Sequence, residues 1–219
     1  MLKLPFQLYR NFGKNSYVGE KITQLQHATQ CGLLAEKYVL SSEFKCLKER
    51  KNLNIPFLNE NIIVGSFLHN IGQLLVFEDK IIPYMIKERG GKEDNLNICI
   101  SNHEELGGDY LNKLGFPTLV SDIVRNHINT ERYLISKDKN YYNNLSKTSK
   151  KSFEFQGGLF TSEELTNFER DSFFEIHLKM IEWNNKAKID DPDFLETIEN
   201  MNLIDKYDEM AQVFNKIKN

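Results

Sequence analysis

Residues 61–77 have the sequence NIIVGSFLHNIGQLLVF, and this stretch decides the fold. Apolar residues such as Ile62, Ile63, Val64 and Phe67 give it a face that a helix would bury. The polar pair His69-Asn70 interrupts the apolar run, and Gly72 follows as a punctuating residue. We therefore expect a buried helix over residues 60–68, and then a turn and helix over residues 74–87.

The same helical spacing recurs along most of the chain. Further helices are predicted over residues 21–38, 97–114, 118–132, 146–155, 173–188 and 193–217, the last in one piece or two. Thr161 and Glu164 have the spacing of a capping box at a helix start. Residues 45–57 and 137–151 are polar and are interpreted as solvated loops. No alternation of period two is long enough to indicate a sheet, so the predicted fold class is all-α, a helical bundle.

Composition limits the classes of protein that fit. The 219 residues carry 28 Lys plus Arg and 31 Asp plus Glu, a net charge of -3, so no nucleic-acid partner is expected. No apolar run approaches the roughly 20 residues that span a bilayer, so no membrane partner is expected. Three cysteines without CxxC spacing favour reduced thiols and a cytoplasmic location. We expect one domain over residues 1–219, with a core over 17–190 and the 193–217 helix packed on it.

Histidines supply the first indication of chemistry. The chain has five, and four of them lie one per helix in apolar segments: His27, His69, His103 and His127. Imidazoles that converge from several helices make a natural metal site. His177 lies outside this set and is interpreted as an ordinary core or surface residue.

With these residues the sequence resembles the HD-domain metalloproteins. It is most similar to the mixed-valent diiron oxygenases that cleave organophosphonates, relatives of myo-inositol oxygenase. The resemblance covers roughly residues 17–188. Its motifs here are Tyr17-Val18-Gly19-Glu20, Leu25-x-His27-Ala28, Leu68-His69-Asn70-Ile71-Gly72, His103-Glu104-x-Leu106-Gly107, Arg125-x-His127, Leu145-Ser146-x-x-Ser149 and Trp183-Asn184-Asn185-x-Ala187-Lys188.

The resemblance implies a role for each matched position. His27 and His69 would hold a first iron, and His103 and His127 a second. Tyr17 and Glu20 match a mobile loop that closes the resting site, and Ser149 matches a contact to the phosphonate.

Four positions depart from the family pattern. Asn70 stands where the family has a bridging Asp, and Asn184 where it has a second ligand Asp. Gln73 replaces a His, and Glu131 replaces a Lys that helps to hold the anionic substrate.

These departures change the chemistry expected of the site. A neutral Asn carbonyl is a poorer ligand and bridge than a carboxylate, so the four imidazoles are expected to hold one iron or zinc ion, or none. Glu131 would repel a dianionic phosphonate, and Gln73 cannot carry a proton as His does.

The sequence therefore leaves several functions open. The first is a catalytically impaired or repurposed protein, a pseudoenzyme that binds a small molecule or a single metal in the former active-site pocket. The second is an active metal-dependent oxygenase in which Glu20, Glu104 or Glu105 replaces the missing carboxylates. A phosphohydrolase is ranked last of the activities, and a purely structural or partner-binding role, particularly through the 193–217 helix, also stays open. The sequence does not define an oligomeric state.

Overall fold

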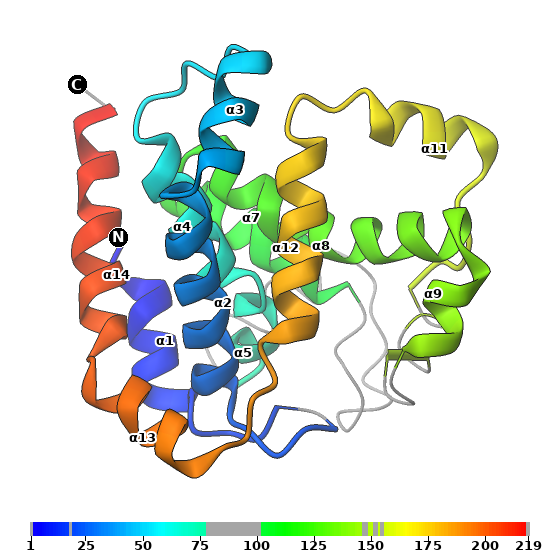
Figure 1. Ribbon diagram of the computed structural model, residues 1–219. Coiled ribbons are helices and arrows are strands. Elements are labelled where there is room, and N and C mark those ends of the chain that lie inside the picture. The colour runs from blue at the N-terminus through cyan, green and yellow to red at the C-terminus, as the bar shows by residue number, and fades with distance from the viewer. Residues whose placement is uncertain are drawn as a thin grey trace.

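The computed structural model describes residues 2–17, 19–77, 102–145, 149–150, 153 and 156–217. Regular structure in these residues is helical, apart from one isolated β-bridge between Ser16 and Thr23 (Figure 1). The elements are α1 (Leu4–Phe12), α2 (Gln24–Val39), α3 (Ser42–Arg50), α4 (Leu58–Leu68), α5 (Ile71–Leu75), α7 (His103–Leu114), α8 (Thr118–Lys137), α9 (Lys139–Asn144), α11 (Ser162–Glu169), α12 (Phe174–Lys186), α13 (Pro192–Asn200), α14 (Leu203–Ala211) and the 3₁₀ helix η1 (Gln212–Ile217). The predicted all-α class is confirmed.

Helix α4 lies at the centre of the bundle. Every residue from Asn61 to Leu68 is buried, because the helix packs against α2, α8 and α14. A helix that is apolar on all sides belongs in such a place. The chain leaves α4 through His69 and Asn70 and enters the short helix α5, which packs on α7.

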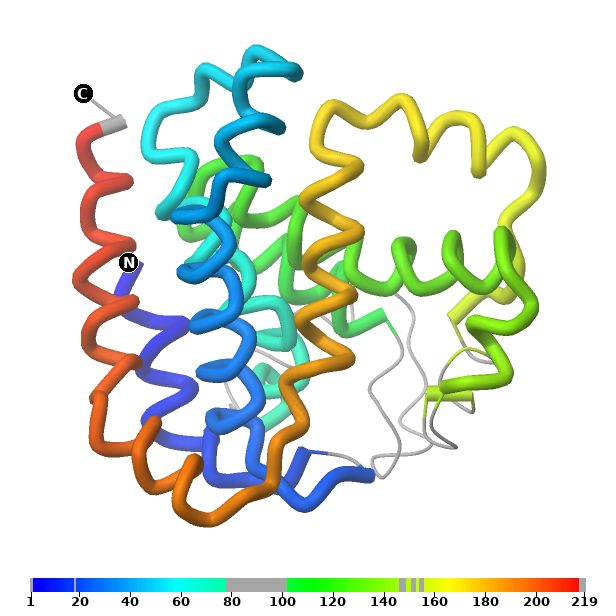
Figure 2. The backbone as a smooth tube through the Cα atoms, viewed as in Figure 1, coloured from blue at the N-terminus to red at the C-terminus, as the bar shows by residue number. Residues whose placement is uncertain are grey.

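The C-terminal segment covers one side of the bundle. It runs as α13, α14 and η1 and lies beside α1 (Figure 1 and Figure 2). Tyr207 and Phe214 are almost completely buried there, and Arg10 of α1 forms ion pairs with Asp205 and Asp208. The expected long helix is thus divided, with Asn202 in the left-handed region between α13 and α14.

Two loop predictions were wrong. Residues 45–57 were expected to form a loop, but helix α3 covers Ser42–Arg50 and is capped by the Ser41 side chain. Its polar residues face solvent, and two apolar residues three positions apart, Phe44 and Leu47, are enough to anchor it. In the second predicted loop, residues 137–151, helix α9 covers Lys139–Asn144.

Several other expectations have clear outcomes. The capping box of Thr161 and Glu164 is present at the start of α11. Helix α1 was not predicted, although its proline at the first turn is a helix-start signal. Most of the helices expected over residues 74–87 and 146–155 lie outside the described residues. No helix in the described part of the chain is long and apolar enough to cross a membrane.

We predict that Gly72→Ala strongly destabilises the fold. A Cβ on Gly72 would collide with the backbone carbonyl of His103, because α5 and α7 touch at this point. Backbone cannot move aside as a flexible side chain can, so we expect a loss of about 3 kcal/mol in the free energy of unfolding. Urea denaturation measures it.

Gly108→Ala is the matched control on α7. The Cβ there would meet the side chain of Arg125, nearest at Cγ, and no backbone, so the clash can be relieved if Arg125 gives up its ion pairs with Glu105 and Asp109. We therefore expect a smaller loss than for Gly72→Ala. An equal loss in both variants would contradict the view that the α5–α7 contact is the rigid one.

Candidate metal centre

Four helices bring four imidazole rings together at the middle of the bundle. His27 comes from α2, His69 from the end of α4, His103 from the start of α7, and His127 from α8. The Nε2 atoms of His27 and His69 are 3.2 Å apart, and those of His103 and His127 are 3.1 Å apart. The rings of His69 and His127 join the two pairs, with centroids separated by 5.3 Å. The convergence expected from the sequence is therefore present.

Backbone carbonyls fix the orientation of three of these rings. Nδ1 of His27 lies 2.8 Å from the carbonyl oxygen of Ala187. Nδ1 of His69 lies 2.8 Å from that of Ser66, and Nδ1 of His127 lies 2.6 Å from that of Val124. A carbonyl oxygen only accepts, so Nδ1 carries the proton and donates. In a neutral ring, Nε2 then carries a lone pair, which points at the neighbouring histidine.

Burial keeps these rings neutral. It lowers the pKa of His27 to about 3, with the neighbouring His69 as a further cause. Burial also lowers the pKa of His69 to about 4, and that of His127 well below its ordinary value. At neutral pH the centre therefore presents unprotonated nitrogen ligands, the form in which histidine binds metal ions.

Asn184 completes the first of the two pairs. Its Oδ1 lies 3.0 Å from Nε2 of His27 and 3.2 Å from Nε2 of His69. Nitrogen and oxygen ligands about 2.0–2.2 Å from a common ion lie about 3.0–3.5 Å from one another. The three donor atoms thus have the mutual spacing of ligands around one cation, and the residues present fit a single metal ion.

A cysteine lies beside this group. Cys31 is one helical turn after His27 on α2, and its Sγ is 3.9 Å from Nε2 of that histidine. His27, Cys31 and His69 offer ligand atoms within 4.8 Å of one another. Burial raises the pKa of the Cys31 thiol, so the sulfur is protonated unless a cation displaces the proton. Cys31 was not predicted as a ligand from the sequence, although it follows His27 by four residues, which is one helical turn.

The second pair has fewer donors. Glu104 approaches His103 on the outer nitrogen Nδ1, at 3.5 Å, so it supports the ring from behind. Asn70 is buried between α4 and α5, in the sparsely populated bridge region of the backbone map. In the described ranges, no Asp or Glu joins either histidine pair in a group that could hold a metal.

The segment before α2 covers the first pair. The Tyr17 ring stacks on the His27 ring with centroids 4.0 Å apart. Gly19, with φ of 82°, allows the turn, and Glu20 forms an ion pair of 3.0 Å with Lys188. Glu20 is thus engaged by Lys188, a residue for which no role was predicted from the sequence.

Glu131 is the unusual acid near the centre. It follows His127 by one turn of α8 and is 6% exposed. Burial raises its pKa to about 7, against an opposing effect of Lys188. Within the described residues its carboxylate makes no hydrogen bond or ion pair. Its charge also helps to raise the pKa of Tyr141, after burial, to about 12.

The remaining predicted positions stay predictions. Gln73 is buried on α5, one turn after His69. Ser149 lies in a short described stretch, with residues on both sides outside it. His177 is completely buried against Phe168 and close to Asp171, so it is an ordinary core histidine.

The fold and these donors define an all-α protein with a candidate metal centre in its core. No model of a known protein family matches the sequence. The chain belongs to the family of "Uncharacterized protein L432" of Acanthamoeba polyphaga mimivirus, with 32% identity over 83% of this chain and 70% of that protein.

Two further relatives carry names that describe an activity. The chain is 28% identical to the hydroxymethylphosphonate dioxygenase of Gimesia maris, over 84% of this chain and 76% of that protein. It is also 29% identical to the glycine-betaine-forming [1-hydroxy-2-(trimethylamino)ethyl]phosphonate dioxygenase of Leisingera caerulea. This match covers 83% of this chain and 79% of that protein. The chain is therefore related to organophosphonate dioxygenases.

We predict that Glu131→Gln stabilises the protein at neutral and alkaline pH. The folded-state pKa of about 7 lies above the ordinary value of 4.5, so the folded protein keeps a proton that the unfolded chain releases. This group's contribution to stability therefore falls as pH rises from 4.5 to 7. The variant should equal the wild type near pH 4 and exceed it by on the order of 3 kcal/mol at pH 8.

Urea denaturation of both proteins across this pH range gives the difference. The buried histidines titrate in both and cancel in the comparison. Glu163→Gln, on the exposed surface of α11, is the control and should show no pH-dependent gain. If the difference in free energy of unfolding between Glu131→Gln and the wild type does not change with pH, the raised pKa is contradicted.

Proposed function

We propose that this chain is an HD-domain relative of the phosphonate dioxygenases that is catalytically impaired or repurposed. In this proposal the former active-site pocket holds a single metal ion and binds a small molecule. The observation that carries it is the donor set of the first pair, in which a neutral amide oxygen, Asn184 Oδ1, joins two neutral imidazoles 3.0 and 3.2 Å away.

The charge of the donors supports one ion rather than two. His27, His69 and Asn184 offer three neutral ligand atoms, which suit one zinc or ferrous ion with added water. His103 and His127 offer two nitrogens, and Asn70 stands where the resemblance places a bridging carboxylate. Two ions close together need anionic ligands to offset their repulsion. When bound, an ion here supplies Lewis acidity, and redox chemistry as well if it is iron.

The residues around the pocket support a changed ligand. Glu131 brings a buried acid, which has no hydrogen-bond or ion-pair partner among the described residues, to the position of a family lysine, and Lys188 is already engaged by Glu20. The anionic phosphonate group, which the names of both dioxygenase relatives contain, would be repelled here. Tyr17, stacked on His27, covers one side of the first pair. The pocket therefore favours a small molecule that carries less negative charge than a phosphonate.

An active oxygenase is the second candidate. Two observations favour it: the names of the two relatives, and the Nε2 separations of 3.2 and 3.1 Å in the two histidine pairs. Against it, Glu20 is paired with Lys188, and Glu104 approaches the outer nitrogen of His103. Both acids are therefore badly placed to replace the missing carboxylates.

We predict that the purified wild-type protein carries no more than one metal ion per chain. The double variant Asn70→Asp with Asn184→Asp should bind two irons, because it restores two anionic ligands between the four imidazoles. Elemental analysis after expression in iron-supplemented medium measures both. His27→Ala is the control and should lose the ion from the wild type.

Oxygen consumption separates the two candidate functions. The wild type should consume no oxygen with hydroxymethylphosphonate. Two tightly held irons in the wild type, or turnover that a chelator abolishes, would overturn the proposal in favour of the active oxygenase.

We also predict that Glu131→Lys increases the affinity for hydroxymethylphosphonate at least tenfold at pH 8. The change replaces repulsion by attraction beside the anion, and tenfold corresponds to about 1.4 kcal/mol. Isothermal titration calorimetry measures the affinity. Glu163→Lys makes the same change of charge on the surface of α11 and should leave the affinity within twofold; a similar gain there would mean that overall charge is responsible.

A further inference from the structure

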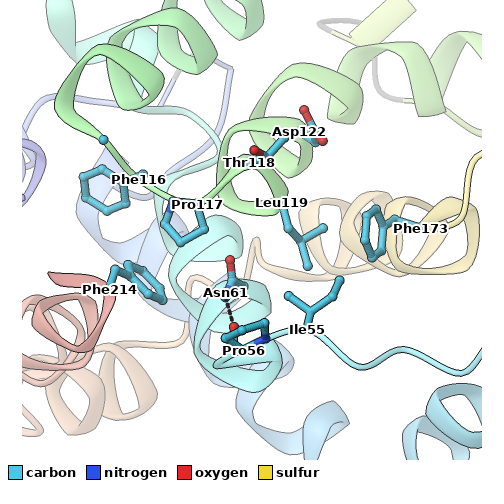
Figure 3. A pocket seen from close by; sticks show the side chains of 11 residues that line it. Ile55, Pro56, Asn61, Phe116, Pro117, Thr118, Leu119, Asp122, Phe173 and Phe214 are labelled. Atoms are coloured by element: carbon cyan, nitrogen blue, oxygen red, sulfur yellow. Dashed lines mark hydrogen bonds between the residues drawn. The ribbon is translucent and has the colours of Figure 1, made fainter. Parts of the chain in front are cut away.

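A cavity lies at the opposite end of α4 from the histidines. Its volume is about 380 Å³, and it opens where the loop before α4 meets the turn between α7 and α8 (Figure 3). Asn61, in the first turn of α4, lies at its floor, eight residues before His69. Eight residues of helix correspond to about 12 Å, so this cavity is separate from the candidate metal centre.

Five of the eleven residues that line the cavity carry rings. Phe116 and Pro117 come from the turn between α7 and α8, Phe173 from the start of α12, and Phe214 from η1. Pro56 closes the side next to α4 (Figure 3). Flat, apolar walls of this kind favour a planar apolar ligand.

Asn61 supplies one polar group inside this apolar surface. Its side chain is completely buried, and Nδ2 donates to the carbonyl oxygens of Pro56 at 3.1 Å and Phe57 at 2.7 Å. Two carbonyl acceptors fix which end of the amide is the nitrogen, since the oxygen cannot take that place.

The Oδ1 atom of Asn61 is consequently held on the other side. It is buried and has no hydrogen-bond partner among the residues that the structure describes, and it points toward Pro117 and Leu119 (Figure 3). A buried acceptor without a donor costs free energy, and native proteins rarely leave one without a reason. A ligand that brings a donor to this atom would remove that cost.

The rim adds a second acceptor. Asp122 lines the cavity from α8, and its side chain is 33% exposed. The charged groups that face Asp122 are Arg125, Asp171 and His177. Asn61 and Asp122 both offer acceptors to the cavity, and Thr118, the third polar side chain of the lining, lies exposed at its mouth. A negative charge on Asp122 disfavours an anionic ligand.

We propose that this cavity is a binding site for a planar, uncharged aromatic molecule that carries an N–H or O–H donor. The ring lies among the phenylalanine and proline side chains, and its donor binds Oδ1 of Asn61. The site does not depend on metal binding or on phosphonate chemistry.

A matched pair of ligands tests this on the wild-type protein. Indole and 1-methylindole have nearly the same apolar surface, and only indole has a donor. Ligand-observed NMR titration should give saturable binding of indole with a Kd below roughly 1 mM, and at least tenfold weaker binding of 1-methylindole. Equal affinity for the two, or no saturable binding of indole, overturns the proposal.

Two variants locate the site. Thr118→Trp places a bulky ring at the exposed mouth of the cavity and should abolish indole binding without changing the thermal midpoint. Asn61→Leu should remove the preference for indole over 1-methylindole. If Asn61→Leu does not fold, the ligand pair and Thr118→Trp decide the question. Unchanged binding to Thr118→Trp places indole elsewhere and overturns the proposal.

Discussion

Hydrogen bonds from imidazole Nδ1 to backbone carbonyls govern the centre of this protein. Three of the four converging histidines donate to a carbonyl of the chain, at Ala187, Ser66 and Val124. Each bond selects one tautomer and turns the Nε2 lone pair toward the bundle axis. Two of these carbonyls belong to the residue three positions before the histidine, so the helix itself sets the ring. The remaining one, at Ala187, requires α12 to end beside α2.

Much of this centre was predictable from the sequence. One histidine on each of four apolar helices predicts convergence, because the buried faces of a bundle meet at its axis. The orientation of the His27 ring was not predictable, since it depends on the carbonyl of Ala187, which is far away in the chain. The raised pKa of Glu131 was also hidden, because burial of an acid is a property of the assembled helices.

The errors in the predicted secondary structure came from segments of polar composition. The α3 segment was taken for a loop because charged residues dominate it, yet Ser41 caps the helix and Phe44 packs against Tyr38. A short helix at the edge of a domain needs little apolar surface, so composition alone underestimates it. The cavity at Asn61 left no such pattern in the sequence, because its walls come from four separate segments.

The amide at Asn184 gives the centre two ways to satisfy the lone pairs that face one another there. With Oδ1 turned inward, three lone pairs face one another at 3.0–3.2 Å, and a cation between them relieves the repulsion. The same amide rotated by half a turn would present Nδ2, whose two hydrogens match the two imidazole lone pairs. An aspartate has no such second arrangement, because its ionised form only accepts. Compared with the aspartate that the resemblance places at this position, the amide lowers the cost of the metal-free state as well as the affinity for metal. In the single-ion site that we propose, the ion is therefore a ligand that the pocket can gain or lose.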